Sequence, residues 1–154
     1  MSPDFIRKHI RLKDFPYKTG YVYFITICTF DRQPHFINKE LAGFIESVID
    51  FYINNNTIAV YCYCIMPDHI HILLSLCDEY EKGLSSWVSS FKRYINAEAE
   101  NRFRIKNIWQ GNYHDHVVRT NESLNNIAEY ILNNPVRKGI VSEWMEYPFS
   151  KIKL

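Results

Sequence analysis

The chain has 154 residues, of which 47% are hydrophobic and 16% aromatic. Those values are enough for one domain with a substantial core, and they exclude a chain too polar to fold, so we expect a single domain over residues 1–154. The formal net charge is +1, which excludes the strongly basic composition typical of DNA-binding domains. Any nucleic-acid surface must therefore depend on how the charges are distributed.

The cysteines and the apolar segments bear on the compartment in which the protein works. The four cysteines (Cys28, Cys62, Cys64 and Cys77) lie in apolar, strand-like stretches without paired metal-ligand spacing. This pattern indicates buried, reduced thiols. No apolar run approaches the roughly 18 residues that span a bilayer, and the N-terminal residues lack the pattern of a signal peptide. We therefore expect a cytoplasmic protein.

The first half of the chain predicts a strand, a helix and a hairpin. Residues 21–30 form a β-branched and aromatic run that indicates a strand. Asn38 is the expected N-cap of a helix whose apolar residues recur at intervals of three and four and which ends at residues 54–56. Residues 58–66 and 69–76 are two further strands, and the two-residue corner between them requires antiparallel neighbours.

The second half predicts two helices with a strand between them. A helix runs from Leu84 to about residue 101, and a strand is expected within residues 105–118. The last helix opens at Thr120 or Asn121, and Pro135 closes it. The order of elements predicts an α+β fold, namely a ferredoxin-like (RRM-like) antiparallel sheet of four to five strands with helices packed on one face.

A tyrosine on the last predicted helix lies off its apolar stripe. At 100° per residue, Tyr130 is about 130° from the centre of that stripe, and Asn134, one turn later, is about 40° from Tyr130. Both side chains are therefore expected on a face that the hydrophobic pattern leaves free. A half-exposed packing tyrosine followed by a capping asparagine is the alternative.

Two histidines open the third predicted strand. His69 and His71 are two residues apart, so they share one face of the strand and are close enough to bind one metal ion. With six histidines in the chain, this spacing alone is a weak signal. A second pair, His114 and His116, is either a rival or accessory ligand set or a pair of hydrogen-bonded structural groups.

Four segments, in this order, resemble the motifs of one family. They are residues 23–27 (Tyr-Phe-Ile-Thr-Ile), 66–71 (Met-Pro-Asp-His-Ile-His), 109–110 with 115–119 (Trp-Gln with Asp-His-Val-Val-Arg) and 130–131 with 134–135 (Tyr-Ile with Asn-Pro). The family is that of the REP-associated tyrosine transposases, insertion sequence 200-like members of the HUH superfamily of single-tyrosine transposases. The order of the motifs, with the histidines before the tyrosine, resembles that of transposases and rolling-circle initiators. It differs from the order in relaxases, whose tyrosine precedes the histidines.

The resemblance implies a mechanism and a set of site residues. Members of the family nick single-stranded DNA by tyrosine attack, which leaves a 3′-hydroxyl and a 5′-phosphotyrosine link, so Tyr130 is the expected nucleophile. His69, His71 and Asn134 are the expected ligands of a divalent metal, Mg²⁺ or Mn²⁺, with His116 as a further candidate. A metal held by neutral imidazoles keeps its Lewis acidity for the phosphate oxygens.

The resemblance also implies the substrate, a folded single-stranded DNA hairpin. Basic clusters can follow its phosphates and aromatic rings can stack on unpaired bases, although each cluster also fits an ordinary solvated surface. The candidate DNA contacts are Arg7, Lys8, Arg11, Lys92, Arg93, Trp109, Tyr113 and Arg119. A homodimer in which helices are exchanged stays open.

Two other functions remain open at this level. One is a metallohydrolase that uses the same histidines to activate water and does not need Tyr130. The other is a noncatalytic hairpin-DNA binder, a decayed transposase. A covalent protein–DNA adduct distinguishes the strand transferase from both.

Overall fold

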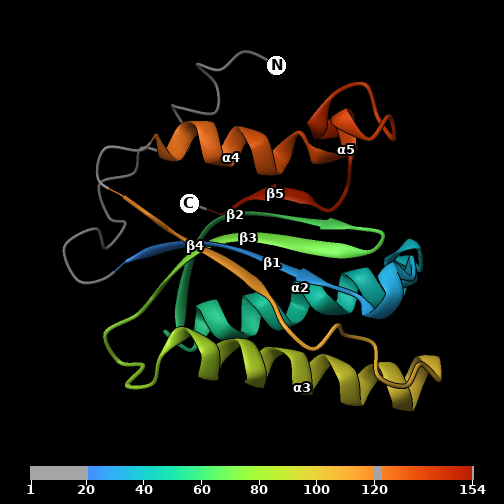
Figure 1. Cartoon of the computed structure of the whole chain (residues 1–154), viewed down its shortest axis with the longest axis horizontal. Helices are drawn as coiled ribbons and strands as arrows, with labels where there is room; N and C mark the ends of the chain where they lie inside the picture. Colours follow the sequence, from blue (N-terminus) through green and yellow to red (C-terminus); the bar gives the residue numbers. More distant parts are fainter. Residues whose placement is uncertain (1–20, 120–122, 154) are drawn as a thin grey trace.

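A five-stranded antiparallel sheet forms the middle layer of the molecule (Figure 1). The coordinates are a computed structural model, which describes residues 21–119 and 123–153. The strand order is β4-β1-β3-β2-β5, with every neighbouring pair antiparallel. The first four strands have the ferredoxin-like order, so the predicted fold is confirmed. The strands are β1 Val22–Cys28, β2 Ile58–Met66, β3 His69–Leu76, β4 His114–Val118 and β5 Ser150–Ile152.

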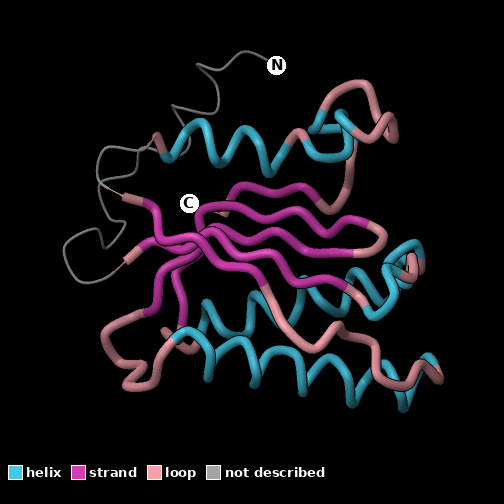
Figure 2. Tube along the Cα trace, in the orientation of Figure 1, coloured by secondary structure: helices cyan, strands magenta, loops and turns pink. Residues whose placement is uncertain are grey.

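Helices cover both faces of the sheet (Figure 2). The long helices α2 (Lys39–Asn54) and α3 (Leu84–Phe103) lie on one face. Helix α4 (Leu124–Leu132) and the short α5 (Asn134–Arg137) lie on the other. The expectation of helices on one face is therefore wrong for the last helix. The reason is that β2 and β3 are apolar on both sides, and a strand of this kind needs a cover on each face.

Two separate cores result from this arrangement. On the α2–α3 side, Ile70 and Ile72 of β3 join Trp87 and Phe91 in a large apolar cluster. On the α4 side, Leu73 of the same strand joins a smaller cluster with residues of β2 and α4. Side chains that alternate along a strand point to opposite faces, so residues of β3 at odd positions, including both histidines, belong to the α4 side.

Several predicted boundaries agree with the structure and others do not. β2 and β3 have the predicted bounds, and Asn38 caps α2 by accepting hydrogen bonds from the next helical amides. Helix α4 begins after Ser123, whose hydroxyl accepts from the amide of Asn126. The predicted start at Thr120 or Asn121 lies outside the described residues. Pro135 does not close α4 but lies in the first turn of α5, where its missing amide proton costs nothing.

The C-terminal segment adds an element that the sequence pattern did not predict. After the 3₁₀ turn Trp144–Glu146, the three residues of β5 pair with the outer edge of β2. The Tyr147 hydroxyl donates to the carbonyl of Ile65 at 2.6 Å, which holds this segment against the sheet. No helix in residues 21–119 or 123–153 is long and apolar enough to cross a membrane.

Candidate active site

The imidazoles of His69 and His71 lie side by side at the start of β3. Their ring centroids are 4.6 Å apart, and the planes are inclined by 72°. Both residues are buried, with exposed fractions of 4% and 6%. β3 begins directly after the turn at Pro67 and Asp68. Because side chains two residues apart on a strand point to the same face, both rings lie on the face of the sheet that α4 covers.

Each imidazole is fixed through its Nδ1 atom. His69 Nδ1 lies 2.7 Å from Asp68 Oδ1, and Arg32 Nε donates to the other oxygen of that carboxylate at 3.0 Å. His71 Nδ1 lies 2.8 Å from the hydroxyl of Thr26, the residue that faces it across β1 and β3. Among the described residues, neither Nε2 has a hydrogen-bond partner. An imidazole held through Nδ1 presents its other nitrogen to a metal.

Burial keeps both imidazoles neutral. It lowers the pKa of His71 to about 3, with smaller contributions from His69, Arg137 and Arg32. Burial also lowers the pKa of His69, and it outweighs the opposing hydrogen bond and charge of Asp68. Burial alone would raise the pKa of Asp68, but the hydrogen bonds and charges of His69 and Arg32 together exceed that effect and lower it. At neutral pH, therefore, an ionised Asp68 accepts a hydrogen bond that the Nδ1–H group of a neutral His69 donates.

A third potential ligand is the side chain of Asn134. The sequence predicted Asn134 at the end of the helix that carries Tyr130, but in the structure it begins the next helix, α5. Its side chain is buried, with an exposed fraction of 4%. Within the described residues, its Oδ1 is buried and has no hydrogen-bond partner. An unpaired buried carbonyl oxygen is costly unless a ligand or ion completes it. The same residues contain no cluster of three histidine, cysteine or carboxylate side chains that could hold a metal ion, which leaves the two imidazoles and this amide oxygen as the candidate donors.

Helix α4 brings Tyr130 to the same place. Its ring centroid lies 6.1 Å from that of His71 and 6.1 Å from that of Phe24. The side chain is 50% exposed, because the stripe that buries Ala128, Ile131 and Leu132 against the sheet leaves Tyr130 at its border. The imidazole pair and the tyrosine of one chain thus meet in space, although they are distant in sequence.

The second histidine pair lies on the same sheet face but farther away. His114 and His116 are exposed residues of the edge strand β4, where they face Thr26 and Phe24 of β1. β1 therefore lies between His116 and the imidazole pair. The structure does not bring His116 together with His69 and His71.

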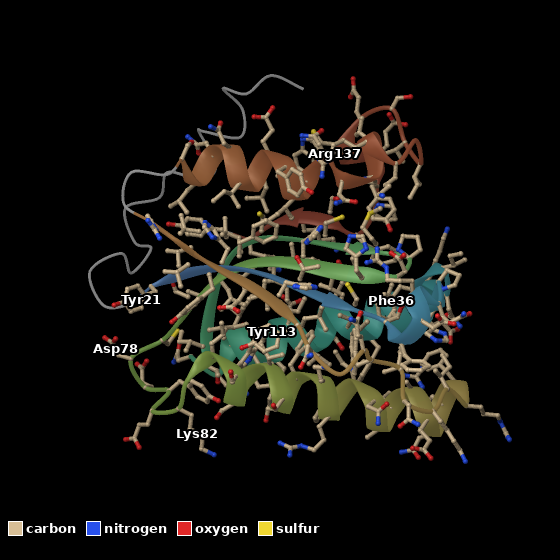
Figure 3. The ribbon with its side chains drawn as sticks, viewed as in Figure 1. Tyr21, Phe36, Asp78, Lys82, Tyr113 and Arg137 are labelled. Atoms are coloured by element: carbon tan, nitrogen blue, oxygen red, sulfur yellow. The ribbon has the colours of Figure 1, made fainter. Side chains whose placement is uncertain are left out.

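Four of the candidate DNA contacts lie on the α2–α3 side of the sheet, away from the imidazoles. Trp109 packs between Phe36 and Phe91, and its Nε1 donates to the carbonyl of Lys92. Lys92 Nζ donates to the carbonyl of Gln110 at 2.7 Å. Arg93 belongs to α3, and the Tyr113 hydroxyl lies beside Ser85 of the same helix (Figure 3). The structure therefore brings none of these four residues to the candidate site. Arg119 follows β4, and Arg7, Lys8 and Arg11 lie outside the described residues.

Four residues of the site were not predicted from the sequence: Thr26, Arg32, Asp68 and Arg137. Thr26 could have been found from the alternation along β1, once its register with β3 was known. Arg32 reaches Asp68 because the backbone bends there. Asp31 and Arg32 have φ values of 55° and 53°, a left-handed conformation that costs roughly 1–2 kcal/mol per residue. Nothing in the local pattern indicates such a bend.

Comparisons with known proteins show the family to which the chain belongs. Residues 17–134 match the family model described as "Transposase IS200 like". An Escherichia coli protein named REP-associated tyrosine transposase is 23% identical over 134 residues, which cover 87% of this chain and 78% of that protein. An uncharacterized Haemophilus influenzae protein is 28% identical over 162 residues, with coverages of 84% and 88%.

A solved structure shares the fold. It is described as a REP-associated tyrosine transposase bound to a REP hairpin, and the two folds agree with a TM-score of 0.66 at 22% identity. The match covers 85% of this chain and 76% of the other.

Proposed function

Because the chain belongs to the IS200-like transposase family, we propose that it nicks and rejoins single-stranded hairpin DNA through a covalent link to Tyr130. The observation that carries this proposal is the meeting of Tyr130 with the imidazole pair, at 6.1 Å between the rings of Tyr130 and His71. A tyrosine that served only packing would not need to stand half-exposed beside two buried, neutral histidines. The hairpin substrate rests on the similar fold that is described as hairpin-bound.

The proposed step exchanges one phosphodiester for another. The Tyr130 oxygen forms a bond to the scissile phosphorus, and the bond from phosphorus to the 3′-oxygen breaks. The phenolic proton passes to water, and the leaving 3′-oxygen takes a proton from water. The product is a 5′-phosphotyrosine with a free 3′-hydroxyl, so the bond energy is kept for rejoining.

The donor set fits a hard divalent cation. His69 and His71 would bind Mg²⁺ or Mn²⁺ through Nε2, and the unpaired Oδ1 of Asn134 would complete the set. When bound, the cation would act as a Lewis acid on the phosphate oxygens and help to orient them. Neutral imidazoles are needed for this, and burial keeps them neutral. The Nδ1 partners Asp68 and Thr26 hold the rings in the orientation that leaves Nε2 available.

The test is the covalent adduct itself. Incubation of the protein with labelled hairpin DNA and Mn²⁺, followed by denaturation in detergent, should give a retarded protein–DNA band. The band should be absent for Tyr130→Phe, because only the nucleophilic oxygen is removed from a half-exposed side chain. Cleavage that persists in Tyr130→Phe without an adduct would instead support a metallohydrolase. Hairpin binding with neither cleavage nor adduct would support a noncatalytic binder.

A matched arm of the same experiment tests whether one chain completes the site. The ring of Tyr130 lies beside the imidazole of its own chain, so we propose that a single subunit is sufficient. Inactive Tyr130→Phe and His69→Ala subunits, when mixed, should then form no adduct. Restored adduct formation would mean that the helix is exchanged between subunits.

A further inference from the structure

Cations predominate among the charged groups that act on the imidazole pair. Arg32, Arg137 and Lys138 act on the pKa values of these histidines, and the carboxylate that does so is Asp68. Asp68 is already engaged by His69 and by Arg32, which donates to it at 3.0 Å. Within the described residues, Arg137 and Lys138 thus add positive charge near the imidazole pair, and neither forms an ion pair with a carboxylate. This condition suits an anionic ligand.

The guanidinium of Arg137 lies directly against the proposed nucleophile. Its Cζ is 3.9 Å from the centroid of the Tyr130 ring, a close cation–π contact. Arg137 is exposed and ends α5, the short helix that begins with Asn134, and it lies on the α4–α5 side of the sheet (Figure 3). It also acts on His71, with an effect that lowers the pKa of that imidazole.

Arg137 differs from Arg32 and Arg102 in its ion pairing with carboxylates. Arg32 is paired with Asp68 and Arg102 with Glu98. Within the described residues, no carboxylate lies within ion-pair distance of Arg137. Its close contact in the described residues is with the ring of Tyr130, a weak partner that an anion would displace. The guanidinium is therefore available to a ligand without the loss of an ion pair.

We propose that Arg137 is a catalytic residue that binds the non-bridging oxygens of the scissile phosphate when single-stranded DNA is in place; this rests on the proposed function. A planar guanidinium donates two parallel hydrogen bonds to a phosphate, which an ammonium group does not. Negative charge increases on these oxygens as the Tyr130 oxygen attacks, so a fixed cation stabilises the transition state more than the ground state. In the DNA-free protein the same side chain covers the ring of Tyr130 and keeps it in place.

The test compares two substrates that differ only in charge at the scissile position. One hairpin carries the normal phosphodiester, and the other carries a methylphosphonate, in which a methyl group replaces one charged oxygen. The single-turnover rate of adduct formation is measured at saturating DNA with Mn²⁺ for the wild type, Arg137→Ala and Arg137→Lys. Arg102→Ala is the matched control, because Arg102 also lies over an aromatic ring, that of Phe103, but belongs to α3 on the other face.

On the phosphodiester, Arg137→Ala should slow adduct formation by about 100-fold or more, the usual loss when one donor to a developing oxyanion is removed. Arg137→Lys should recover only part of this loss, and Arg102→Ala should match the wild type. On the methylphosphonate, the wild type and Arg137→Ala should have similar rates, because the oxygen charge that Arg137 stabilises has been reduced. Thermal unfolding of Arg137→Ala should match that of the wild type.

Three results would overturn the proposal. Arg137→Ala could react with the phosphodiester as fast as the wild type. It could lose the same factor on both substrates, which would mean that Arg137 acts only by holding Tyr130. If the wild type forms no adduct with the phosphodiester hairpin, the proposed function fails and this inference fails with it. If Arg137→Ala unfolds, Arg137→Lys takes its place in the comparison. A larger loss of rate on the phosphodiester than on the methylphosphonate would then support the proposal, and equal losses would overturn it.

Discussion

The two faces of the sheet are built for different purposes. One is covered by the long helices α2 and α3, of 16 and 20 residues, over a continuous apolar cluster. The other is covered by the 9-residue α4 and the short α5 over a smaller cluster. Only this second face holds the buried imidazoles and the unpaired amide oxygen of Asn134. The first face thus supplies stability, and the second accepts polar groups that lower it.

The largest expected effect is on the α2–α3 face. Phe91 is fully buried and its ring lies 5.1 Å from that of Trp87. Phe91→Ala should lower the free energy of unfolding by about 3–5 kcal/mol, because it removes a large side chain and leaves a cavity. Urea unfolding followed by circular dichroism measures this value. A loss below about 1 kcal/mol would contradict the assignment of stability to this face.

A change on the other face should affect metal binding more than stability. Asp68→Ala removes the carboxylate that holds His69 through Nδ1 and should weaken Mn²⁺ binding by about 10–100-fold. The urea midpoint should fall as well, since the mostly buried carboxylate also accepts from Arg32, but the protein should still fold because both apolar clusters are unchanged. Free Mn²⁺ is measured by electron paramagnetic resonance. Asp50→Ala, which removes an exposed carboxylate paired with Lys153, is the control and should bind Mn²⁺ like the wild type.

The buried imidazoles should make this face sensitive to acid. In the unfolded chain His71 takes up a proton near its ordinary pKa of about 6.5, but in the folded protein burial lowers its pKa to about 3. The unfolded state therefore binds more protons as pH falls from about 6.5 towards 3, and stability that is fully present above this range is lost. Metal-free wild type should lose more stability between pH 7 and pH 4.5 than His71→Gln. Equal losses in urea titrations would contradict the prediction.

The smallest effect compares the helix caps of the two faces. Ser123 caps α4 and Asn38 caps α2, each through a side-chain oxygen that accepts from helical amides. Alanine at either position should cost about 1 kcal/mol of stability. Only Ser123→Ala should also slow adduct formation, because α4 carries Tyr130. Equal adduct rates for both variants would show that the α4 cap does not affect the nucleophile.

The sequence predicted the central hairpin well, and the rings of three of the candidate site residues (His69, His71 and Tyr130) lie close together in the structure. β2 and β3 are uninterrupted apolar runs joined by a two-residue turn, so local pattern alone defines them. The helical pattern predicted Tyr130 off the apolar stripe of α4, and in the structure its side chain is half-exposed. β5 has only three residues, one of them an exposed lysine, and forms because the chain end returns to a free strand edge. No local pattern predicts such a return.

The sequence by itself determined the residue types of the site: two histidines on one strand face, a tyrosine outside an apolar stripe and an asparagine one turn later. The tertiary structure alone decided that α4 covers the second face, which brings Tyr130 to His71. It also brought Asp68 to the Nδ1 atom of His69 and Arg32 to Asp68. In the same way, it placed the guanidinium of Arg137 over the ring of Tyr130. The physical reason is that strand and helix periods specify which face a side chain occupies, whereas contacts between distant segments depend on the packing of both cores.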